Sequence, residues 1–271
     1  VRNMVASVVF IIYISKFLAV IVLLFSEIIR FFQWSGQKIS QINTPVSDSP
    51  TIPRSTFLTQ AALAVGGAQL GAMTWGIISG AHDYRIRRVT LRLPNLPKKF
   101  QGMTIAQLSD IHTGSFFNKT AVQGGVDLLL SQKPDVVFFT GDLVNNEAKE
   151  VKEYFAIFAQ VKAPLGVYST LGNHDYGDYV KWPSLDAKQR NMEKLLRNQN
   201  KMGFQMLLNG HTRIEKDGQS IVLAGVENWG NRRGFAKYGD LSKALSGVRN
   251  DDFTILLSHD PSHWEVETLP H

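Results

Sequence analysis

The 271-residue chain contains no cysteine, which excludes a disulfide framework and any metal site built on thiolates. This absence does not distinguish a cytoplasmic protein from an exported one. Acidic residues are also in the minority, with 23 against 29 lysines and arginines, and the formal net charge is +6. The excess of positive charge suits an anionic partner, such as phosphate groups or acidic lipid head groups, and does not require a nucleic acid. The sequence has no internal repeat and no low-complexity tract.

Two long apolar segments lie in the N-terminal third of the chain. Residues 5–25 are apolar except for Ser7, Ser15 and Lys16, and residues 57–80 carry no charge. Each segment is long enough to cross a hydrocarbon core of about 30 Å. The composition therefore predicts two membrane-spanning helices.

The boundaries that we expect are a transmembrane region over residues 1–34, a loop over residues 35–56, and a second transmembrane or signal-anchor helix over residues 57–80. A charge within a bilayer is costly, so Lys16 leaves a second interpretation open, in which one helix ends near Ile14 and another begins at Lys16. A buried apolar helix of a soluble protein is a third interpretation.

Residues 84–93 open the second part of the chain, with basic or polar side chains alternating with apolar ones. A period of two is typical of a half-buried strand. We therefore expect a domain boundary near residues 81–83 and a catalytic domain over residues 84–271, whose first strand is residues 84–93.

Further strands and helices alternate along this domain. Apolar runs at residues 103–108, 136–140 and 166–171 predict buried strands. Residues 120–130 and 151–161, which separate them, carry apolar residues at helical spacing. The order β-α-β-α-β predicts a mostly parallel sheet.

Three polar clusters follow the three predicted strands. They are Asp110-Ile111-His112, Gly141-Asp142 and Gly172-Asn173-His174-Asp175. Because the carboxyl ends of parallel strands meet at one edge of a sheet, we expect the clusters to share a site. Carboxylate, imidazole and amide oxygen together bind divalent ions such as Mn²⁺, Fe²⁺ or Zn²⁺.

Two such ions, about 3.5–4 Å apart, can clamp a phosphate group and lower the pKa of a bound water. The pair needs a bridging carboxylate. Asp142 is the candidate, because Gly141 before it allows the backbone to approach closely and the carboxylate offers two oxygens. Asp110 and His112 would then hold one ion and Asn173 the other.

The order of these motifs resembles that of the calcineurin-like metallophosphoesterase superfamily. The series is Asp-x-His, Gly-Asp, Gly-Asn-His-Asp, and then a histidine, His259, which follows an apolar run at residues 253–257. The resemblance extends from about Ile86 to the end of the chain. It implies an α/β fold, a calcineurin-like β-sandwich flanked by helices, preceded here by the N-terminal transmembrane helices.

The resemblance also implies a role for each matching residue. The ligands of two divalent ions, Mn, Fe or Zn, would be Asp110, His112, Asp142, Asn173 and His259. Asp142 would bridge the ions, with Asp110 and His112 on the first and Asn173 and His259 on the second. His174 would contact the phosphate and the leaving oxygen, and Asp175 would orient His174.

One motif of the family is missing. The family closes its site with Gly-His-x-His some way after the position of His259, and neither His263 nor His271 matches it. With two imidazoles fewer, a chain ending here is expected to bind metal weakly and to be a poor catalyst. Since the chain begins with Val1 rather than Met, we expect it to be an excerpt, C-terminally incomplete, whose complete gene supplies the motif.

Two inserts, residues 176–183 and 227–238, combine aromatic and charged side chains. Together they are candidates for a substrate rim that stacks on a sugar or base, or rests on lipid, while the arginines meet phosphate. The rim residues would be Tyr176, Tyr179, Trp182, Trp229, Arg232 and Arg233. The alternative is two surface loops whose aromatic side chains pack onto the domain.

These features predict a membrane-anchored, metal-dependent phosphoesterase. It would hydrolyse a phosphodiester in preference to a monoester, with a hydroxide activated by two metal ions. The alternative is a catalytically weak or inactive membrane scaffold or binding module on the same fold. Family members with this layout imply the bacterial inner membrane, an extracytoplasmic catalytic domain, and a lipid-linked or cell-envelope ester as substrate. The sequence predicts no particular oligomeric state and no nucleic-acid partner.

Overall fold

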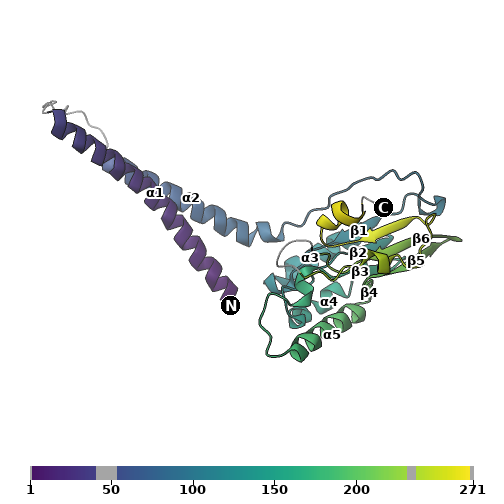
Figure 1. Ribbon diagram of the computed structural model, residues 1–271. Coiled ribbons are helices and arrows are strands. Elements are labelled where there is room, and N and C mark those ends of the chain that lie inside the picture. Colours follow the sequence, from purple (N-terminus) through teal and green to yellow (C-terminus); the bar gives the residue numbers. More distant parts are fainter. Residues whose placement is uncertain (1, 41–53, 231–235, 269–271) are drawn as a thin grey trace. The chain divides into compact units, whose positions relative to one another are not determined.

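The computed structural model of the chain describes residues 2–40, 54–230 and 236–268 (Figure 1). The chain divides into two compact units, Val1–Asp83 and Tyr84–His271. The first unit contains helices α1 (Arg2–Ser40) and α2 (Arg54–Ile78). Within them, Val5–Gly36 and Thr56–Ile78 are long and apolar enough to cross a membrane.

Helices α1 and α2 lie side by side and pack through a narrow seam (Figure 1). Ile11, Ser15 and Ser26 of α1 and Ala62 of α2 are buried in this seam. The helices are also close at Gly66, where a Cβ would lie 3.2 Å from the carbonyl oxygen of Ser15. Most of the large apolar side chains of both helices are exposed, as expected of helices whose surroundings are lipid.

Helix α1 is one uninterrupted helix, so the interpretation with a break between Ile14 and Lys16 is wrong. A single lysine can remain in a helix, because its long side chain reaches out along the surface. Here the ammonium group of Lys16 lies 5.7 Å from the centroid of the Tyr13 ring, at a distance typical of a cation–π contact.

The connection between the two helices is shorter than expected. Helix α1 continues to Ser40, past the predicted end at residue 34, and α2 begins at Arg54 rather than at residue 57. No proline precedes Pro45, and one glycine in this region is not enough to end a helix. The rest of the predicted loop, residues 41–53, lies outside the described residues.

Two sheets form the centre of the second unit. The first sheet contains the parallel strands β1 (Ile105–Leu108), β2 (Val136–Phe139), β3 (Val167–Ser169) and β4 (Gln205–Met206), in that order. The second sheet contains β5 (Gly210–Lys216), β6 (Gln219–Gly225) and β7 (Thr254–Leu257), with β5 antiparallel and β7 parallel to β6. The predicted apolar runs are confirmed as β1, β2, β3 and β7, each somewhat shorter than expected.

The α-helices in the described part of this unit are α3 (Lys119–Ser131), α4 (Phe155–Phe158), α5 (Leu185–Lys201) and α6 (Leu241–Ala244). The side chain of Asn118 caps α3 and that of Ser184 caps α5, each by accepting a hydrogen bond from a backbone amide of the first turn. The unit's short 3₁₀ segments are η2 (Lys98–Phe100), η3 (Thr113–Ser115), η4 (Ala148–Glu153) and η5 (Asn173–Tyr176), and η6 (Trp264–Thr268) is a π-helix. The 3₁₀ segment η1 (Gly80–His82) belongs to the first unit.

Strand β2 shows why the sheet is covered on both faces. Val137 and Phe139 belong to the apolar cluster that contains side chains of α3 and α5. Val136 and Phe138 belong to the other cluster, with side chains of β5, β6 and β7. Successive strand residues face opposite sides, so an uninterrupted apolar strand lies between a helical layer and a second sheet. The expected α/β sandwich flanked by helices is confirmed.

Residues 84–93 form no strand, which corrects the prediction from their alternating pattern. They pair with no strand in the described parts of the chain, and Val89 and Leu91 are 80% and 69% exposed. An alternating pattern becomes a strand only where a neighbouring strand accepts its hydrogen bonds. At the start of this segment, Tyr84 packs over α3, where a Cβ on Gly125 would lie 2.9 Å from the tyrosine ring.

The predicted helix over residues 151–161 is also wrong in its extent. The chain forms η4 and the single helical turn α4 in its place. The Glu150 carboxylate accepts hydrogen bonds from the amides of Asn145, Asn146 and Glu147, which holds the chain in a tight capped turn. The helix predicted over residues 120–130 is confirmed as α3.

Candidate metal centre

The loops after β1, β2 and β3 bring the three polar clusters together at the carboxyl edge of the first sheet. Asp110, His112 and Asp142 have left-handed backbone conformations, with φ of 53°, 49° and 58°. Such a conformation costs a non-glycine residue of order 1–3 kcal/mol and persists only where the surroundings enforce it. Here the amide of Asp110 donates to the carbonyl of Gly141 at 3.1 Å, and the amide of His112 donates to that of Asp142 at 3.0 Å. The neighbouring loop therefore enforces the strained geometry.

Two glycines allow the loops after β2 and β3 to touch. Gly141 has a φ of +99°, and a Cβ there would lie 2.3 Å from the nitrogen of Gly172. A Cβ on Gly172 would lie 2.2 Å from Oδ1 of Asp142. Neither position has room for a side chain, so the glycines of both motifs are needed for this contact.

Asp175 is completely buried and joins the same two loops. Its carboxylate accepts hydrogen bonds from the amides of Asp142, Leu143, Val144 and Gly172, at 2.8 to 3.4 Å. Burial is the largest influence on this carboxyl and raises its pKa to about 7, with the charge of Asp142 acting in the same direction and the amide donors opposing both. These bonds order the backbone around Asp142. The predicted role of Asp175, orienting His174, would act through this backbone, because the His174 ring itself is held by another group.

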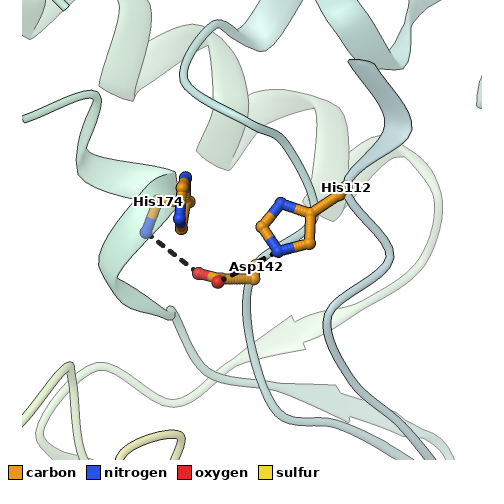
Figure 2. A group of neighbouring side chains, drawn as sticks. All are labelled: His112, Asp142 and His174. Atoms are coloured by element: carbon orange, nitrogen blue, oxygen red, sulfur yellow. Dashed lines mark hydrogen bonds and ion pairs between the residues drawn. The ribbon is translucent and has the colours of Figure 1, made fainter. Parts of the chain in front are cut away.

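Asp142 belongs to two groups of potential metal ligands. One group is His112, Asp142 and His174, and the other is Asp110, Asp142 and His259, with the ligand atoms of each group within 4.8 Å of one another. Oδ2 of Asp142 is 3.4 Å from Nε2 of His112 and 3.5 Å from Nε2 of His259. Figure 2 shows His112 and His174 on either side of the Asp142 carboxylate. The Asp142 carboxylate is therefore common to both groups of potential ligands.

The two groups divide the predicted ligands differently from the resemblance. Asp110 lies with His259, whereas the resemblance places it with His112. Asp110 is exposed, and Asp142 is only 2% exposed. Asp142 is thus a buried member of both groups, whereas Asp110 is an exposed member of one.

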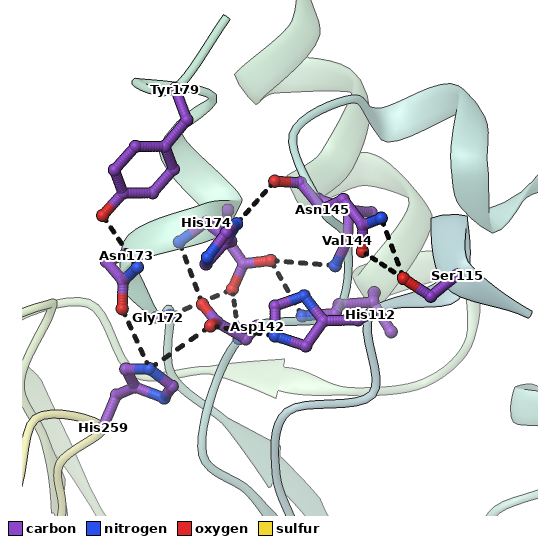
Figure 3. A network of polar contacts seen from close by, with 12 residues as sticks. His112, Ser115, Asp142, Val144, Asn145, Gly172, Asn173, His174, Tyr179 and His259 are labelled. Carbon is purple, nitrogen blue, oxygen red and sulfur yellow. Dashed lines mark hydrogen bonds and ion pairs between the residues drawn. The ribbon is translucent and has the colours of Figure 1, made fainter. Parts of the chain in front are cut away.

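The surroundings of His259 test whether the residues present fit a cation. Nδ1 lies 2.8 Å from the carbonyl oxygen of Thr140, which can only accept, so Nδ1 carries the proton. Nε2 of the neutral ring then presents a lone pair, 3.2 Å from Oδ1 of Asn173 and 3.5 Å from Oδ2 of Asp142 (Figure 3). Three acceptor atoms that face one another repel unless a proton or a cation lies among them. Nitrogen and oxygen donors of these types fit a divalent metal ion.

His174 is fixed at both its backbone and its ring. Its amide donates to Oδ1 of Asp142 at 2.9 Å, and Nδ1 donates to the carbonyl of Asn145 at 2.7 Å (Figure 3). Nε2 is therefore the accepting nitrogen of the neutral ring. The ring lies edge-on to that of His112, with centroids 4.7 Å apart. His174 thus presents one defined nitrogen beside the candidate ligands.

Sequence reasoning missed the groups that hold these histidines. The carbonyls of Thr140 and Asn145 fix the two rings, and Glu150 fixes the loop that contains Asn145. Backbone carbonyls leave no trace in the residue type, so no sequence signal marks the first two. Glu150 follows Glu147 by three residues, which is the spacing of a capping box and the one signal that was available.

Two predicted rim residues are buried. Tyr176 and Trp229 are 6% and 4% exposed, so neither can line an open rim. Tyr176 donates to Glu227 at 2.9 Å, and Trp229 stacks on His263 with ring centroids 4.6 Å apart. Both side chains pack onto the domain, which is the alternative that the sequence left open.

The other rim candidates have different environments. Trp182 is partly buried, and its Nε1 donates to the carbonyl of Gly177 at 2.7 Å. Tyr179 is 44% exposed and contacts the site directly. Arg232 and Arg233 lie outside the described residues.

Comparison with known families identifies both parts of the chain. The family model described as calcineurin-like phosphoesterase matches residues 103–270. A second family, 4TM_phosphoesterase, described as a calcineurin-like phosphoesterase transmembrane domain, matches residues 1–81. The first match covers more than half of the chain and contains every candidate ligand.

Individual relatives carry related descriptions. A transmembrane protein with metallophosphoesterase domain from Bos taurus is 32% identical over 196 residues, and its counterpart in Danio rerio is 29% identical over 194 residues. In both cases the match covers 69% of this chain and 41% of the relative, so the chain spans about two fifths of their length. UDP-2,3-diacylglucosamine pyrophosphatase LpxG from Chlamydia trachomatis is 36% identical over 232 residues, which are 70% of this chain and 67% of that protein.

Proposed function

This chain belongs to the calcineurin-like phosphoesterase family, and we propose that it is a membrane-anchored hydrolase that cleaves a phosphodiester or diphosphate bond with the help of two divalent metal ions. Membership of this family accounts for hydrolysis of phosphoric esters, and the match of residues 1–81 to a transmembrane domain accounts for membrane association. The number of ions and the kind of bond are the proposal. The observation that carries it is the position of Asp142, whose carboxylate is common to two groups of ligands.

In this proposal Asp142 lies between the ions. His112 would hold one ion, and Asn173 and His259 would hold the other, while Asp110 completes the set. When bound, two such ions neutralise phosphate oxygens and lower the pKa of a water between them. Mn, Fe and Zn are all compatible with these donors.

His174 is the residue that we assign to the phosphate or the leaving oxygen. Its Nδ1 donates to the Asn145 carbonyl, so Nε2 is the nitrogen at which the ring would accept a proton and give it to the leaving oxygen. Asp175 supports this arrangement indirectly, since it orders the loop from which Asp142 and the Asn145 carbonyl project. Both residues can therefore affect catalysis, and only His174 would touch the reacting atoms.

We infer that the substrate is an ester carried on lipid or on the cell envelope. Two candidate membrane spans in the same chain support this inference, because they keep the catalytic unit tethered to the bilayer. The similarity to a pyrophosphatase named for a diacylated nucleotide sugar also supports it. We further propose the bacterial inner membrane as the location, with the catalytic unit on its extracytoplasmic side.

The test is hydrolysis of an aryl phosphodiester and of the matching monoester by the full-length protein in detergent, stripped of metal and then titrated with Mn²⁺. Asp142→Asn keeps the size of the side chain and removes its charge. It should lower Mn²⁺-dependent cleavage by more than the roughly 10–100-fold that loss of an outer partner costs. Asp127→Asn, at an exposed position on α3, is the matched control and should retain activity.

Mn²⁺-dependent cleavage of the diester, lost in Asp142→Asn and kept in Asp127→Asn, is the expected result. A folded protein without turnover in any divalent ion would overturn the proposal. That result would favour the alternative of a membrane scaffold or binding module on the same fold.

A further inference from the structure

Tyr179 is a partly exposed side chain that contacts two residues of the candidate metal centre. Its hydroxyl oxygen accepts a hydrogen bond from Nδ2 of Asn173 at 2.8 Å (Figure 3). Its ring lies beside that of His174, with centroids 4.7 Å apart and planes inclined by 46°. Tyr179 lies outside the Gly-Asn-His-Asp motif, in the insert that follows it, and so belongs to a part of the chain that the motif does not define.

The contact with Tyr179 holds the side-chain amide of Asn173. Nδ2 can only donate and Oδ1 can only accept. Because Nδ2 points to the tyrosine, Oδ1 points to Nε2 of His259 at 3.2 Å. This is the orientation that a cation requires, since the reverse would place two N–H groups against it. The hydroxyl accepts the hydrogen bond that keeps the amide in this orientation.

The loop that carries Tyr179 is anchored on both sides of it. Asp178 forms an ion pair with Lys188 of α5 and accepts a hydrogen bond from the Tyr238 hydroxyl at 3.1 Å. Trp182 closes the loop through its bond to the carbonyl of Gly177, which has a φ of +66° that suits glycine. The fold of the insert therefore fixes the backbone on both sides of Tyr179.

We propose that Tyr179 is a positioning residue for the ion held by Asn173 and His259. The hydroxyl fixes the ligand amide, and the ring supports the imidazole of His174. The inference rests on the proposed two-metal function. It replaces the role of Tyr179 as a general aromatic rim by a specific one, acting through Asn173.

Tyr179→Phe is the variant that isolates the hydroxyl, because the ring and its contact with His174 remain. Outer partners of metal ligands typically contribute about 10–100-fold to metal affinity. The exposed position of Tyr179 allows water to replace part of the lost bond, so we expect the low end, a weakening of about 10-fold. Only one of the two ions should be affected, since the side chain of His112 does not depend on Asn173.

The experiment is a titration of the metal-free, full-length protein in detergent with Mn²⁺. Metal binding is monitored by calorimetry and by electron paramagnetic resonance. Two Mn²⁺ ions that share a carboxylate give a coupled signal, and one ion gives an isolated signal. Tyr168→Phe is the matched control, because it removes a hydroxyl that bonds Gln205, an exposed residue that is not a candidate ligand. Circular dichroism establishes that each variant is folded.

The expected result is that Tyr179→Phe needs about tenfold more Mn²⁺ to develop the coupled signal, while its first ion binds as in the wild type and Tyr168→Phe behaves as the wild type. A Tyr179→Phe variant that binds both ions with wild-type affinity would overturn the positioning role of the Tyr179 hydroxyl and leave the proposed two-metal function standing. A wild-type protein that never shows the coupled signal would overturn the proposed two-metal function, and this inference with it.

Tyr179→Leu extends the test to the ring. At saturating Mn²⁺, its kcat for the aryl diester should fall below that of Tyr179→Phe, because the imidazole of His174 loses its neighbour. Equal kcat values for the two variants would overturn the contribution of the ring and leave that of the hydroxyl.

Discussion

Replacing Gly172 with alanine should damage the metal centre without changing any of its ligand side chains. A Cβ at this position would lie 2.2 Å from Oδ1 and 2.8 Å from Cγ of Asp142, whereas ordinary contact begins at 3.4 Å. The carboxylate would have to move by about 1 Å, and Asp142 is buried among groups that cannot yield easily. A misplacement of about 1 Å can cost on the order of 100-fold in rate, and overpacking of a filled site costs about 1–3 kcal/mol.

Gly124→Ala is the matched control for this prediction. Gly124 lies on α3, and a Cβ there would meet nothing within 4 Å. Alanine should therefore stabilise the helix by up to about 1 kcal/mol and leave the site unchanged. The assays are thermal unfolding followed by circular dichroism and Mn²⁺-dependent hydrolysis of an aryl diester.

For a domain of this size, a change of 1 kcal/mol shifts Tm by about 2–4 °C. Gly172→Ala should thus lower Tm by several degrees and kcat/KM by about 100-fold, whereas Gly124→Ala should raise Tm slightly and leave kcat/KM unchanged. A Gly172→Ala variant with wild-type Tm and wild-type kcat/KM would refute the close approach of the two loops.

Two further predictions concern charges away from the ligands. The side chain of Arg213 is the largest influence on the carboxyl of Asp252, followed by the amide and side chain of Arg249, and together they lower its pKa below the unfolded value of about 3.9. The contribution of Asp252 to stability is therefore fully present above pH ~3.9 and is lost as the pH falls through the folded pKa. Asp252→Asn should consequently lower Tm at pH 7 and have progressively less effect toward pH ~2; a difference in Tm that stays constant across this range would contradict the assignment. Glu150→Gln should cost about 1–3 kcal/mol, because an NH₂ group replaces one acceptor of the backbone amides, and should also lower kcat through the Asn145 carbonyl that holds His174. Loss of stability with an unchanged kcat would show that Glu150 supports the fold alone.

The parallel sheet and the place of the site could be predicted because both depend on residue types that follow one another along the chain. Strand β2 is buried on both faces and therefore has an apolar residue at every position from Val136 to Phe139. The polar clusters stand out because each comes directly after such a run. Their convergence follows from the parallel order of the strands, since carboxyl ends meet at one edge.

Other features could not be predicted, because they depend on atoms that residue types do not reveal. The carbonyls of Thr140 and Asn145 choose the proton position of two histidines, and any residue could supply such a carbonyl. The alternation at residues 84–93 resembles a strand, but pairing depends on a neighbour elsewhere in the chain. The exposure of Tyr179 and the burial of Tyr176 likewise depend on the path of the insert, which two similar aromatic residues do not distinguish.

The left-handed backbone at Asp110, His112 and Asp142 creates a trade-off between the stability of the protein and its activity. Glycine adopts this conformation without strain, so glycine at any of the three positions would relax the backbone and at the same time delete a candidate ligand. Directed evolution for heat resistance alone would consequently favour the loss of these side chains, and selection for turnover would favour their return. Laboratory lineages of this protein that become thermostable should first be sequenced across these three codons.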